Sequence, residues 1–369
     1  MTDTTARPDL VGLTPTAARE ALATHFAARR EPAYRVDQVL DWLFAKLAAS
    51  FDEMTNLSKA TRTALAEAFT LTALEPAKIS RSSDGTAKHL WRLGDHELIE
   101  SVLIPTSTRL TLCISSQAGC AMACTFCATG WMGYQRQLTA GEIVAQYRGA
   151  RAWAAENGYG EISNIVFMGM GEPLMNRQAV FPTLTILNRG YGVGARRITV
   201  STVGIVPGIR EMAQMPEQYR LAISLHAPNH HLRQTLIPVE KKYPLPDLLE
   251  ALREFDEAGG KRITFEYVMI DGVTDALDLA DELAGLVGEF TAFVNLIPFN
   301  PIPATDWRPS PHDRLAEFAA RLEARGVSAF VRQPRGQDIA AACGQLKAEA
   351  THGRAPVQIA PRVRRAAGR

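Results

Sequence analysis

A regular alternation of short β-rich runs with segments of helical periodicity is the feature that most constrains the fold of this chain. From about residue 109 onward, strands recur at spacings of roughly 25 to 50 residues, which is typical of βα units. The sequence therefore predicts an α/β fold with a parallel sheet. The six expected strands are R-L-T-L-C-I-S from 109, I-S-N-I-V-F-M from 162, R-I-T-V-S-T from 197, R-L-A-I-S-L-H from 220, R-I-T-F-E-Y-V-M-I from 262 and A-F-V-N-L-I-P from 292, and a further extended run is V-S-A-F-V-R.

Helix signals fill the gaps between these strands. Thr139 and Glu142 form a capping box that is expected to open a helix ending near Gly158. Ser310 and the proline after it are expected to open another helix, which ends near Gly326.

The N-terminal segment is predicted to form a small helical domain. Thr14 is the expected cap of a helix that starts with Pro15, and Ser58 is the expected cap of a later helix. Farther on, the period becomes that of strands around Asp84 and Gly85, a strong hairpin turn signal. We therefore divide the chain into an N-terminal helical accessory domain at 1–75, a β-extension at 76–108, a barrel or open-sheet core with a C-terminal loop at 109–348, and a basic flexible tail at 349–369.

Composition excludes several other classes of protein. The 369 residues are 46% hydrophobic and 21% charged, as expected of a globular chain with a sizeable core. The sequence has no apolar run long enough to span a membrane and no signal peptide, so we expect a cytoplasmic protein without a membrane partner. The net charge is +1, so any binding of nucleic acid must use a local basic face.

Unusual residues collect where the predicted strands end. In a parallel α/β barrel or open sheet, functional residues lie at the C-terminal ends of the strands and in the loops that follow. The first strand leads into three cysteines, and later strands lead into glycine-rich or polar sequences. These sequences are G-M-G-E-P at 169–173, S-T-V-G at 201–204, S-L-H at 224–226 and P-F-N-P at 298–301.

Three of the five cysteines, Cys120, Cys124 and Cys127, fall within eight residues. Thiolates at these spacings can converge on one side of a loop, and soft sulfur ligands select zinc or iron-sulfur clusters. A zinc site usually takes its remaining ligands from a second cysteine pair, which this sequence lacks. Three thiolates on a 4Fe-4S cluster would leave one iron open for catalysis. Three buried, unreactive cysteines are the alternative without a metal.

The spacing Cys-x3-Cys-x2-Cys, with Phe126 before the last cysteine, resembles the signature of the radical S-adenosylmethionine (SAM) enzymes. Along almost its whole length the chain also resembles the RlmN/Cfr family of adenosine methyltransferases. This resemblance implies a partial (β/α)6 barrel in which Cys120, Cys124 and Cys127 hold a 4Fe-4S cluster and SAM binds the open iron. The matching stretches include Y-R-V-D-Q-V-L-D-W-L, I-E-S-V-L-I-P, M-G-M-G-E-P-L-M-N, S-L-H-A-P, P-F-N-P and A-A-C-G-Q-L.

The same resemblance implies that residues at the strand ends contact SAM. Glycine permits close approach of the backbone, and the polar groups of Glu172 and Asn300 can engage the cofactor. For each polar residue, the alternative is a side chain bonded to neighbouring backbone. The matching positions are Gly171, Glu172, Ser201, Ser224, Leu225, His226 and Asn300.

The resemblance also gives roles to the other two cysteines. One SAM methylates Cys343, and a second SAM yields a 5′-deoxyadenosyl radical that abstracts hydrogen from the new S-methyl group. The resulting methylene radical adds to adenine, and Cys113 resolves the adduct by forming a disulfide with Cys343. Glu100 matches a proton acceptor, although Cys113 could take the proton and Glu100 could be a salt-bridged strand residue. Without the resemblance, lone cysteines are more often core residues.

The implied reaction is methylation of carbon 2 of an adenosine in 23S rRNA, with tRNA as a second substrate. We further expect a flavodoxin-type reductant and a monomer. The alternatives are a carbon-8 methyltransferase of the same family, a glycyl-radical activase and a zinc-stabilised RNA-binding protein. Candidate RNA contacts are Arg29, Arg30, Arg35, Trp42, Trp131, Arg362, Arg364 and Arg365, for which a solvated face or a packed core is the favoured interpretation.

Overall fold

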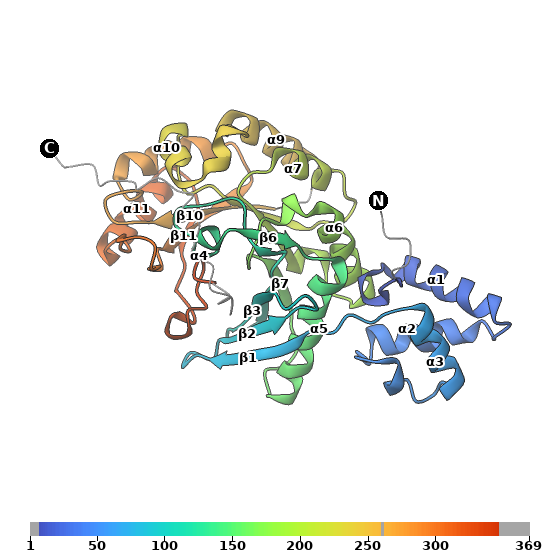
Figure 1. Ribbon diagram of the computed structural model, residues 1–369. Coiled ribbons are helices and arrows are strands. Elements are labelled where there is room, and N and C mark those ends of the chain that lie inside the picture. Colours follow the sequence, from blue (N-terminus) through green and yellow to red (C-terminus); the bar gives the residue numbers. More distant parts are fainter. Residues whose placement is uncertain (1–6, 260–261, 347–369) are drawn as a thin grey trace.

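The computed structural model describes residues 7–259 and 262–346, so the predicted basic tail and its arginines lie outside the described residues. Its centre is a curved sheet with helices over the outer face (Figure 1). The strands of this sheet are β1 (Glu75–Arg81), β2 (Ala87–Arg92), β3 (Leu98–Pro105), β4 (Leu110–Cys113), β7 (Asn164–Phe167), β8 (Ile198–Thr202), β9 (Arg220–Ser224), β10 (Ile263–Met269), β11 (Ala292–Pro298) and β12 (Ala329–Val331).

The ten strands follow the order β1-β2-β3-β4-β7-β8-β9-β10-β11-β12. The pairs from β4 to β12 are parallel, whereas β1 to β4 pair antiparallel. The six predicted parallel strands are therefore confirmed, and the run V-S-A-F-V-R adds β12 at the edge. A separate hairpin consists of β5 (Gln117–Gly119) and β6 (Tyr134–Gln137).

Helices alternate with the parallel strands, as predicted. The capping box is confirmed, because the Thr139 hydroxyl accepts from the Glu142 amide and the Glu142 carboxylate accepts from the Thr139 amide. The last helix begins after Pro311 and ends at Ala324, close to Gly326 as predicted, and no side chain caps its start. The helices are α4 (Ala128–Met132), α5 (Ala140–Glu156), α6 (Arg177–Thr185), α7 (Val206–Ala213), α8 (His230–Leu236), α9 (Leu245–Glu257), α10 (Leu277–Val287) and α11 (His312–Ala324), with short turns η1 (Leu10–Gly12), η2 (Phe51–Glu53), η3 (Pro173–Met175), η4 (Ile186–Gly190), η5 (Ala195–Arg197), η6 (Pro238–Lys241) and η7 (Gln337–Ile339). None of the helices in the described part of the chain has the length and apolar character of a transmembrane span.

The N-terminal helices α1 (Pro15–Ala28), α2 (Tyr34–Phe44) and α3 (Lys59–Ala68) pack around a hydrophobic core of their own. Thr14 and Ser58 cap α1 and α3 as predicted. This helical unit lies beside α5 (Figure 1).

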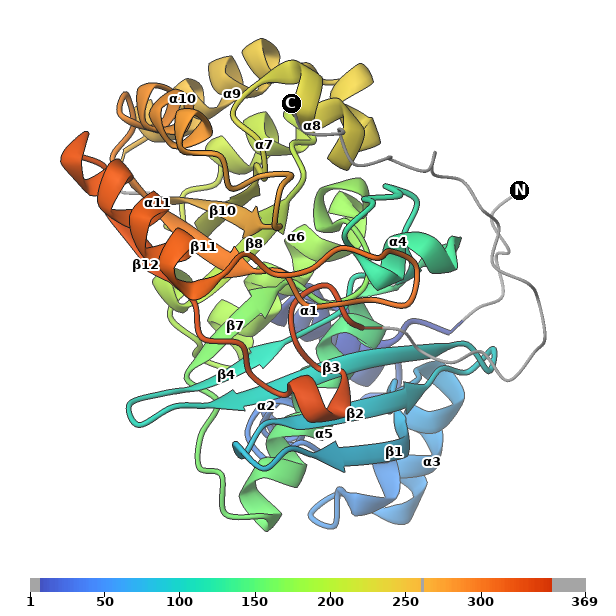
Figure 2. The ribbon, with the colours of Figure 1, turned by 90° about the vertical axis from the view of Figure 1, so that its left-hand side faces the viewer.

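The β-extension continues the central sheet and does not form a separate linker. The turn at Asp84 and Gly85 joins β1 to β2 as predicted, and β3 pairs with β4. The described segment after β12, residues 332–346, lies over β2 and β3 and contains η7 (Figure 2). The residues around Cys343 therefore contact parts of the chain that are remote in sequence.

Candidate active site

The three clustered cysteines lie on a loop between β5 and α4 that several hydrogen bonds hold in place. The Cys120 amide donates to the Gly133 carbonyl (2.8 Å), and the Thr125 amide donates to the Leu236 carbonyl (3.0 Å). Gly130 lets α4 pack closely against this loop, because a Cβ there would lie 2.9 Å from the Cys124 carbonyl oxygen. The loop therefore presents its thiols in a fixed arrangement.

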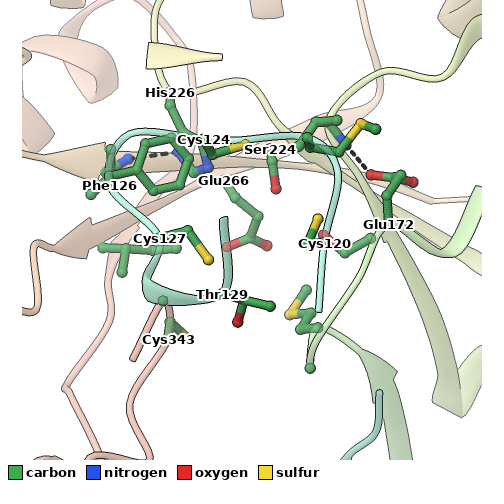
Figure 3. A pocket seen from close by; sticks show the side chains of 18 of the residues that line it. Cys120, Cys124, Phe126, Cys127, Thr129, Glu172, Ser224, His226, Glu266 and Cys343 are labelled. Atoms are coloured by element: carbon green, nitrogen blue, oxygen red, sulfur yellow. Dashed lines mark hydrogen bonds between the residues drawn. The ribbon is translucent and has the colours of Figure 1, made fainter. Parts of the chain in front are cut away.

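The thiols face a pocket at the C-terminal ends of the parallel strands (Figure 3). This is the position expected for the active site of such a fold. Most of the predicted site residues line this one pocket: Cys120, Cys124, Cys127, Gly171, Glu172, Ser201, Ser224, His226, Asn300 and Cys343. Three predicted residues lie outside its lining, namely Glu100, Cys113 and Leu225.

The donor set of this pocket fits an iron-sulfur cluster. Burial raises the pKa of Cys120 to about 12 and that of Cys124 well above its ordinary value, so both thiols resist ionisation in the protein alone. Coordinated metal ions reverse this preference, because a metal-bound thiol is deprotonated. Three closely placed sulfur donors that need a positive partner are suited to iron.

Gly171 and Glu172 form a tight turn after β7. Gly171 has φ of +97°, and a Cβ there would lie 2.5 Å from Cβ of Gln117, so glycine is required. The Glu172 carboxylate accepts hydrogen bonds from the amides of Leu174 and Val203, both at 2.9 Å. Burial raises the pKa of Glu172 to about 7, although these two hydrogen bonds favour the ionised form and lower the pKa. In this structure Glu172 thus joins the loops after β7 and β8.

The sequence S-L-H after β9 contributes two residues to the pocket and one to the core. Ser224 and His226 line the pocket, whereas Leu225 is fully buried. The His226 Nδ1 atom accepts from the Val268 amide (3.0 Å), and the His226 ring contacts the Phe126 ring edge-on at 4.4 Å. Burial lowers the pKa of His226 to about 3, so the ring is neutral at physiological pH.

The loop that carries Cys343 is held against the cluster loop. The Ala128 amide donates to the Gly344 carbonyl (2.7 Å), and the Thr129 hydroxyl donates to the Leu346 carbonyl (2.7 Å). The Asn300 amide group donates to the Cys343 carbonyl (3.0 Å). Cys343 therefore lies in the same pocket as the three clustered cysteines, although it is far from them in sequence (Figure 3).

Cys113 ends β4 and is buried behind this loop. Its pKa rises to about 12, first because of burial and second because the Cys343 thiol is near. Cys343 is exposed to solvent as a residue, yet desolvation by the surrounding protein raises the pKa of its thiol. All five cysteines are free thiols in this structure, so the predicted disulfide between Cys113 and Cys343 is not formed here.

Glu100 lies on β3, outside the lining of the pocket. Its carboxylate pairs with the Lys88 ammonium at 2.9 Å, and both side chains are largely buried. Lys88 also donates to the Ala340 carbonyl (3.1 Å) in the loop that carries Cys343. Glu100 therefore connects to this loop through Lys88.

Two charged residues of the pocket, one acidic and one basic, were not predicted from the sequence. Glu266 on β10 and Arg332 after β12 both line the pocket, and both lie near Cys343. The sequence did contain a signal for Glu266, because this residue is the single acidic one in the strand I-T-F-E-Y-V-M. The structure shows that all of this strand is buried. Arg332 follows a short strand and has no comparable signal.

The described candidates for RNA contact mostly have partners within the chain. Arg29 pairs with Glu31, and Arg35 donates to Gln38. Two tryptophans donate to the polypeptide: Trp42 to the Asn56 side chain and Trp131 to the Thr125 carbonyl.

Comparisons with known proteins show the family to which the chain belongs. The family model of the Radical SAM superfamily matches residues 114–283, and that of the ribosomal RNA large subunit methyltransferase N-terminal domain matches residues 9–71. The chain is 53% identical to the probable dual-specificity RNA methyltransferase RlmN of Gemmatimonas aurantiaca, over 96% of this chain and 97% of that protein. It is 48% identical to the dual-specificity RNA methyltransferase RlmN of an Anaeromyxobacter species, over 94% and 92% of the two chains.

A solved structure is also similar. The crystal structure of a radical SAM methyltransferase from Sphaerobacter thermophilus superposes with a TM-score of 0.88 at 46% identity, covering 93% of this chain and all of that one. The family models, the curated relatives and this solved structure all indicate the same family. The chain belongs to the RlmN family of radical SAM methyltransferases.

Proposed function

We propose that this protein methylates carbon 2 of an adenosine in 23S rRNA, and in tRNA, through a methyl group carried on Cys343. The relatives named above are dual-specificity RNA methyltransferases, which supports RNA as the substrate. The observation that carries the proposal is the position of Cys343 in the pocket of Cys120, Cys124 and Cys127, with Cys113 close behind it. A methyl carrier must reach both the cofactor and the target base, and the open side of the pocket allows this.

Cys120, Cys124 and Cys127 would hold a 4Fe-4S cluster. Cysteine thiolates are the usual ligands of such clusters, and three of them leave one iron open for a cofactor. When bound, the cluster and SAM supply a methyl group and a 5′-deoxyadenosyl radical, at a cost of two SAM molecules per turnover.

Cys343 and Cys113 would act as a pair in this reaction. Cys343 would accept the methyl group on sulfur, lose one hydrogen atom from it and form a carbon-carbon bond to the adenine ring. The radical adduct would give one electron back to the bound cluster and lose the ring proton. The Cys113 thiolate would then attack the Cys343 sulfur, which breaks the bond from this sulfur to the methylene carbon, and the carbon takes up a proton as the methylated base leaves and a disulfide remains. The buried Cys113 thiol has a high pKa and must lose its proton before this attack.

The ring proton has two candidate acceptors. Cys113 lies next to Cys343, whereas Glu100 is held in an ion pair with Lys88. Cys113 can take the ring proton only after it has lost its own, so both candidates stay in this proposal, and Glu100 is tested below. A flavodoxin-type electron donor and a monomeric, cytoplasmic enzyme complete the proposal.

The test is to identify the methylated nucleoside. The reconstituted enzyme, SAM and a flavodoxin system are incubated with unmodified ribosomal RNA and tRNA, and the RNA is digested for mass spectrometry. Wild type should yield 2-methyladenosine, Cys343→Ala should yield none, and Cys113→Ala should accumulate a covalent enzyme-RNA adduct. Exclusive formation of 8-methyladenosine would contradict the assigned carbon, and full activity of Cys343→Ala would contradict the carrier role.

A further inference from the structure

The inner face of the sheet carries two arginines on the strands that lead up to the pocket. Glu266 and Ser224 identify this face, because both line the pocket and Glu266 is directed into the space that the cysteines surround (Figure 3). Side chains alternate along a strand, so Arg262 and Arg220, each four residues earlier, lie on the same face. The Leu221 amide donates to the Arg262 carbonyl (3.1 Å), so the strand pairing extends to this depth. At about 3.3 Å per residue, the arginines lie roughly 13 Å along the strands from the pocket residues.

Two phenylalanines connect Arg262 to the edge of the sheet beside the pocket. The Arg262 guanidinium lies over the Phe293 ring, 4.6 Å from its centroid, and the Phe330 ring contacts Phe293 edge-on at 5.4 Å. Phe330 lies opposite Asn295 in the register of β11 and β12, and Asn295 donates to the Glu266 carboxylate at 2.9 Å. Phe330 is 56% exposed although it is large and apolar. An exposed aromatic ring therefore lies close to the pocket, and a second ring connects it to Arg262.

The charge at the far end of this surface is positive. The pKa of Arg220 is lowered, first by burial and then by the positive charges of Arg262, Arg109 and Arg196. Arg109 directly precedes β4, and Arg196 lies in η5 just before β8, so all four arginines are near the N-terminal ends of strands. The net charge of the whole chain is only +1, so this group is a local concentration of positive charge. Like charges at close range repel, and a bound polyanion relieves this repulsion.

We propose that this surface binds the single-stranded segment of the substrate RNA next to the target adenosine. The contact strip consists of Phe330, Phe293, Arg262 and Arg220. An unpaired base stacks on the exposed Phe330 ring, and phosphates farther along the strand pair with Arg262 and Arg220. Proteins commonly hold unpaired RNA by stacking its bases on aromatic rings and by pairing its phosphates with basic side chains.

Two features favour RNA over an acidic protein as the occupant. The inference rests on the proposed function, in which the target base enters the pocket, and such a base must be unpaired from its neighbours. The nucleotides beside it then pass the rim of the pocket, where Phe330 is exposed. An acidic protein would match the charge of the arginines but would not account for an exposed ring next to the pocket.

The test measures the RNA affinity of the complete, reconstituted enzyme. The probe is a fluorescent stem-loop RNA that carries the target adenosine in its loop, and iron content and circular dichroism show that each variant is loaded and folded. Stacking of one base predicts that Phe330→Ala weakens binding by about tenfold, whereas Phe330→Tyr should bind like wild type. Val331→Ala is the matched control, because Val331 is an exposed neighbour on the opposite face of the same edge strand.

The arginines are tested through the salt dependence of binding. Arg262→Gln and Arg220→Gln should each lower the slope of log Kd against log salt concentration by about 0.7, the value for one phosphate contact on a single strand. Arg253→Gln, which removes an exposed ion pair with Glu289 from the outer helix α9, should leave the slope unchanged.

Probes with one abasic site beside the target adenosine separate the outcomes. At one position, loss of the base should weaken binding by wild type about tenfold and have little further effect on Phe330→Ala. Equal losses in both proteins at every position would overturn the proposal, and so would a wild-type salt dependence in Arg262→Gln. Arginine variants that bind RNA normally but accept electrons more slowly from an acidic flavodoxin-type donor would show a protein-docking surface instead. Failure of wild type to bind any RNA would contradict the proposed function itself.

Discussion

Among single residues, Glu100 is the one for which the structure suggests a role that the sequence did not. Its ion pair with Lys88, and the hydrogen bond from Lys88 to the Ala340 carbonyl, connect it to the loop that carries Cys343. We predict that Glu100→Gln and Lys88→Met cause the same defect, a rate of Cys343 methylation lowered about tenfold, because both loosen this loop. Mass spectrometry of the Cys343 peptide after incubation with SAM measures this rate. Normal Cys343 methylation together with an accumulated RNA adduct in Glu100→Gln alone would instead support a proton acceptor.

His89 gives a second prediction at this scale, concerning stability and pH. It is fully buried, stacks on Trp91 at 5.1 Å, and neither ring nitrogen has a partner among the described residues. Burial lowers its pKa from 6.5 to about 4. Below the unfolded value, the unfolded chain binds a proton that the folded chain does not, so the free energy of unfolding falls as the pH drops from 6.5 towards 4.

The contribution of His89 can be isolated with His89→Phe, which keeps an aromatic ring. Wild type should lose up to about 3 kcal/mol more than the variant between neutral pH and pH 4. Urea unfolding at several pH values measures the difference, and other buried histidines such as His226 cancel in it. Parallel pH profiles of the two proteins would contradict a neutral, buried His89.

Residue-level predictions from the sequence succeeded where a residue belongs to a dense local motif. The cysteine cluster and the G-M-G-E-P turn lie in one pocket as expected. Glu266 was missed because its importance depends on its neighbours Ser224 and Asn295, which are adjacent only after strands pair. The contact of Glu100 with Lys88 could not be predicted either, because it depends on the register of β2 against β3.

At the scale of secondary structure elements, the β1–β2 hairpin holds the loop that carries Cys343. Asp84 accepts from the amide of Thr86 within its own turn (2.8 Å) and from the amide of Gly336 (2.9 Å). Burial disfavours the ionised form of Asp84, but these hydrogen bonds outweigh it and lower the pKa to about 2. The Asp338 carboxylate adds a bond from the Ser83 amide (3.2 Å). The hairpin thus anchors the first half of the loop.

We predict that Asp84→Ala slows methylation of Cys343 by about tenfold or more, because the loop loses its anchor while the cluster loop is unchanged. The matched control is Asp95→Ala in the next turn of the same sheet, where Asp95 pairs with Arg136 away from the loop. Iron content should be equal in both variants. Equal methylation rates in wild type and Asp84→Ala would show that the hairpin does not position Cys343.

Most elements were predictable because their signals are local. Short β-rich runs marked the strands of the parallel sheet, and the capping box marked the start of α5. Two features were not: α6 contains Pro182 and continues directly into the π-helical turn η4, and the C-terminal segment lies over β2. Both depend on tertiary packing, which no local pattern encodes.

At the scale of the whole molecule, Arg148 on α5 connects the N-terminal helical unit to the core. Its guanidinium is buried and donates to the carbonyls of Leu43 and Ala48, each at 2.5 Å, and to the Tyr191 hydroxyl at 2.9 Å. The division into a helical unit and a core was predicted from periodicity. The contact between them was not, because a single arginine in a helix gives no sign of its partners.

Arg148→Met should weaken this contact by about 3 kcal/mol or more, because two buried carbonyls lose a charged donor. Hydrogen exchange should then increase in α2 and the turn after it, while the strands of the core stay protected. Arg19→Met, which removes an exposed ion pair with Asp37 in the same unit, should change stability by about 0.5 kcal/mol at most. Unchanged exchange in α2 of Arg148→Met would contradict the anchoring role.

In the proposed reaction, the methyl group passes through Cys343 before it reaches RNA. The most direct test is to methylate the enzyme with SAM that carries a deuterated methyl group, remove the excess, and allow one turnover on RNA with unlabelled SAM. The methylated adenosine from this turnover should carry deuterium, and deuterium should also appear in 5′-deoxyadenosine. Unlabelled product, with the deuterated methyl group still on Cys343, would contradict it.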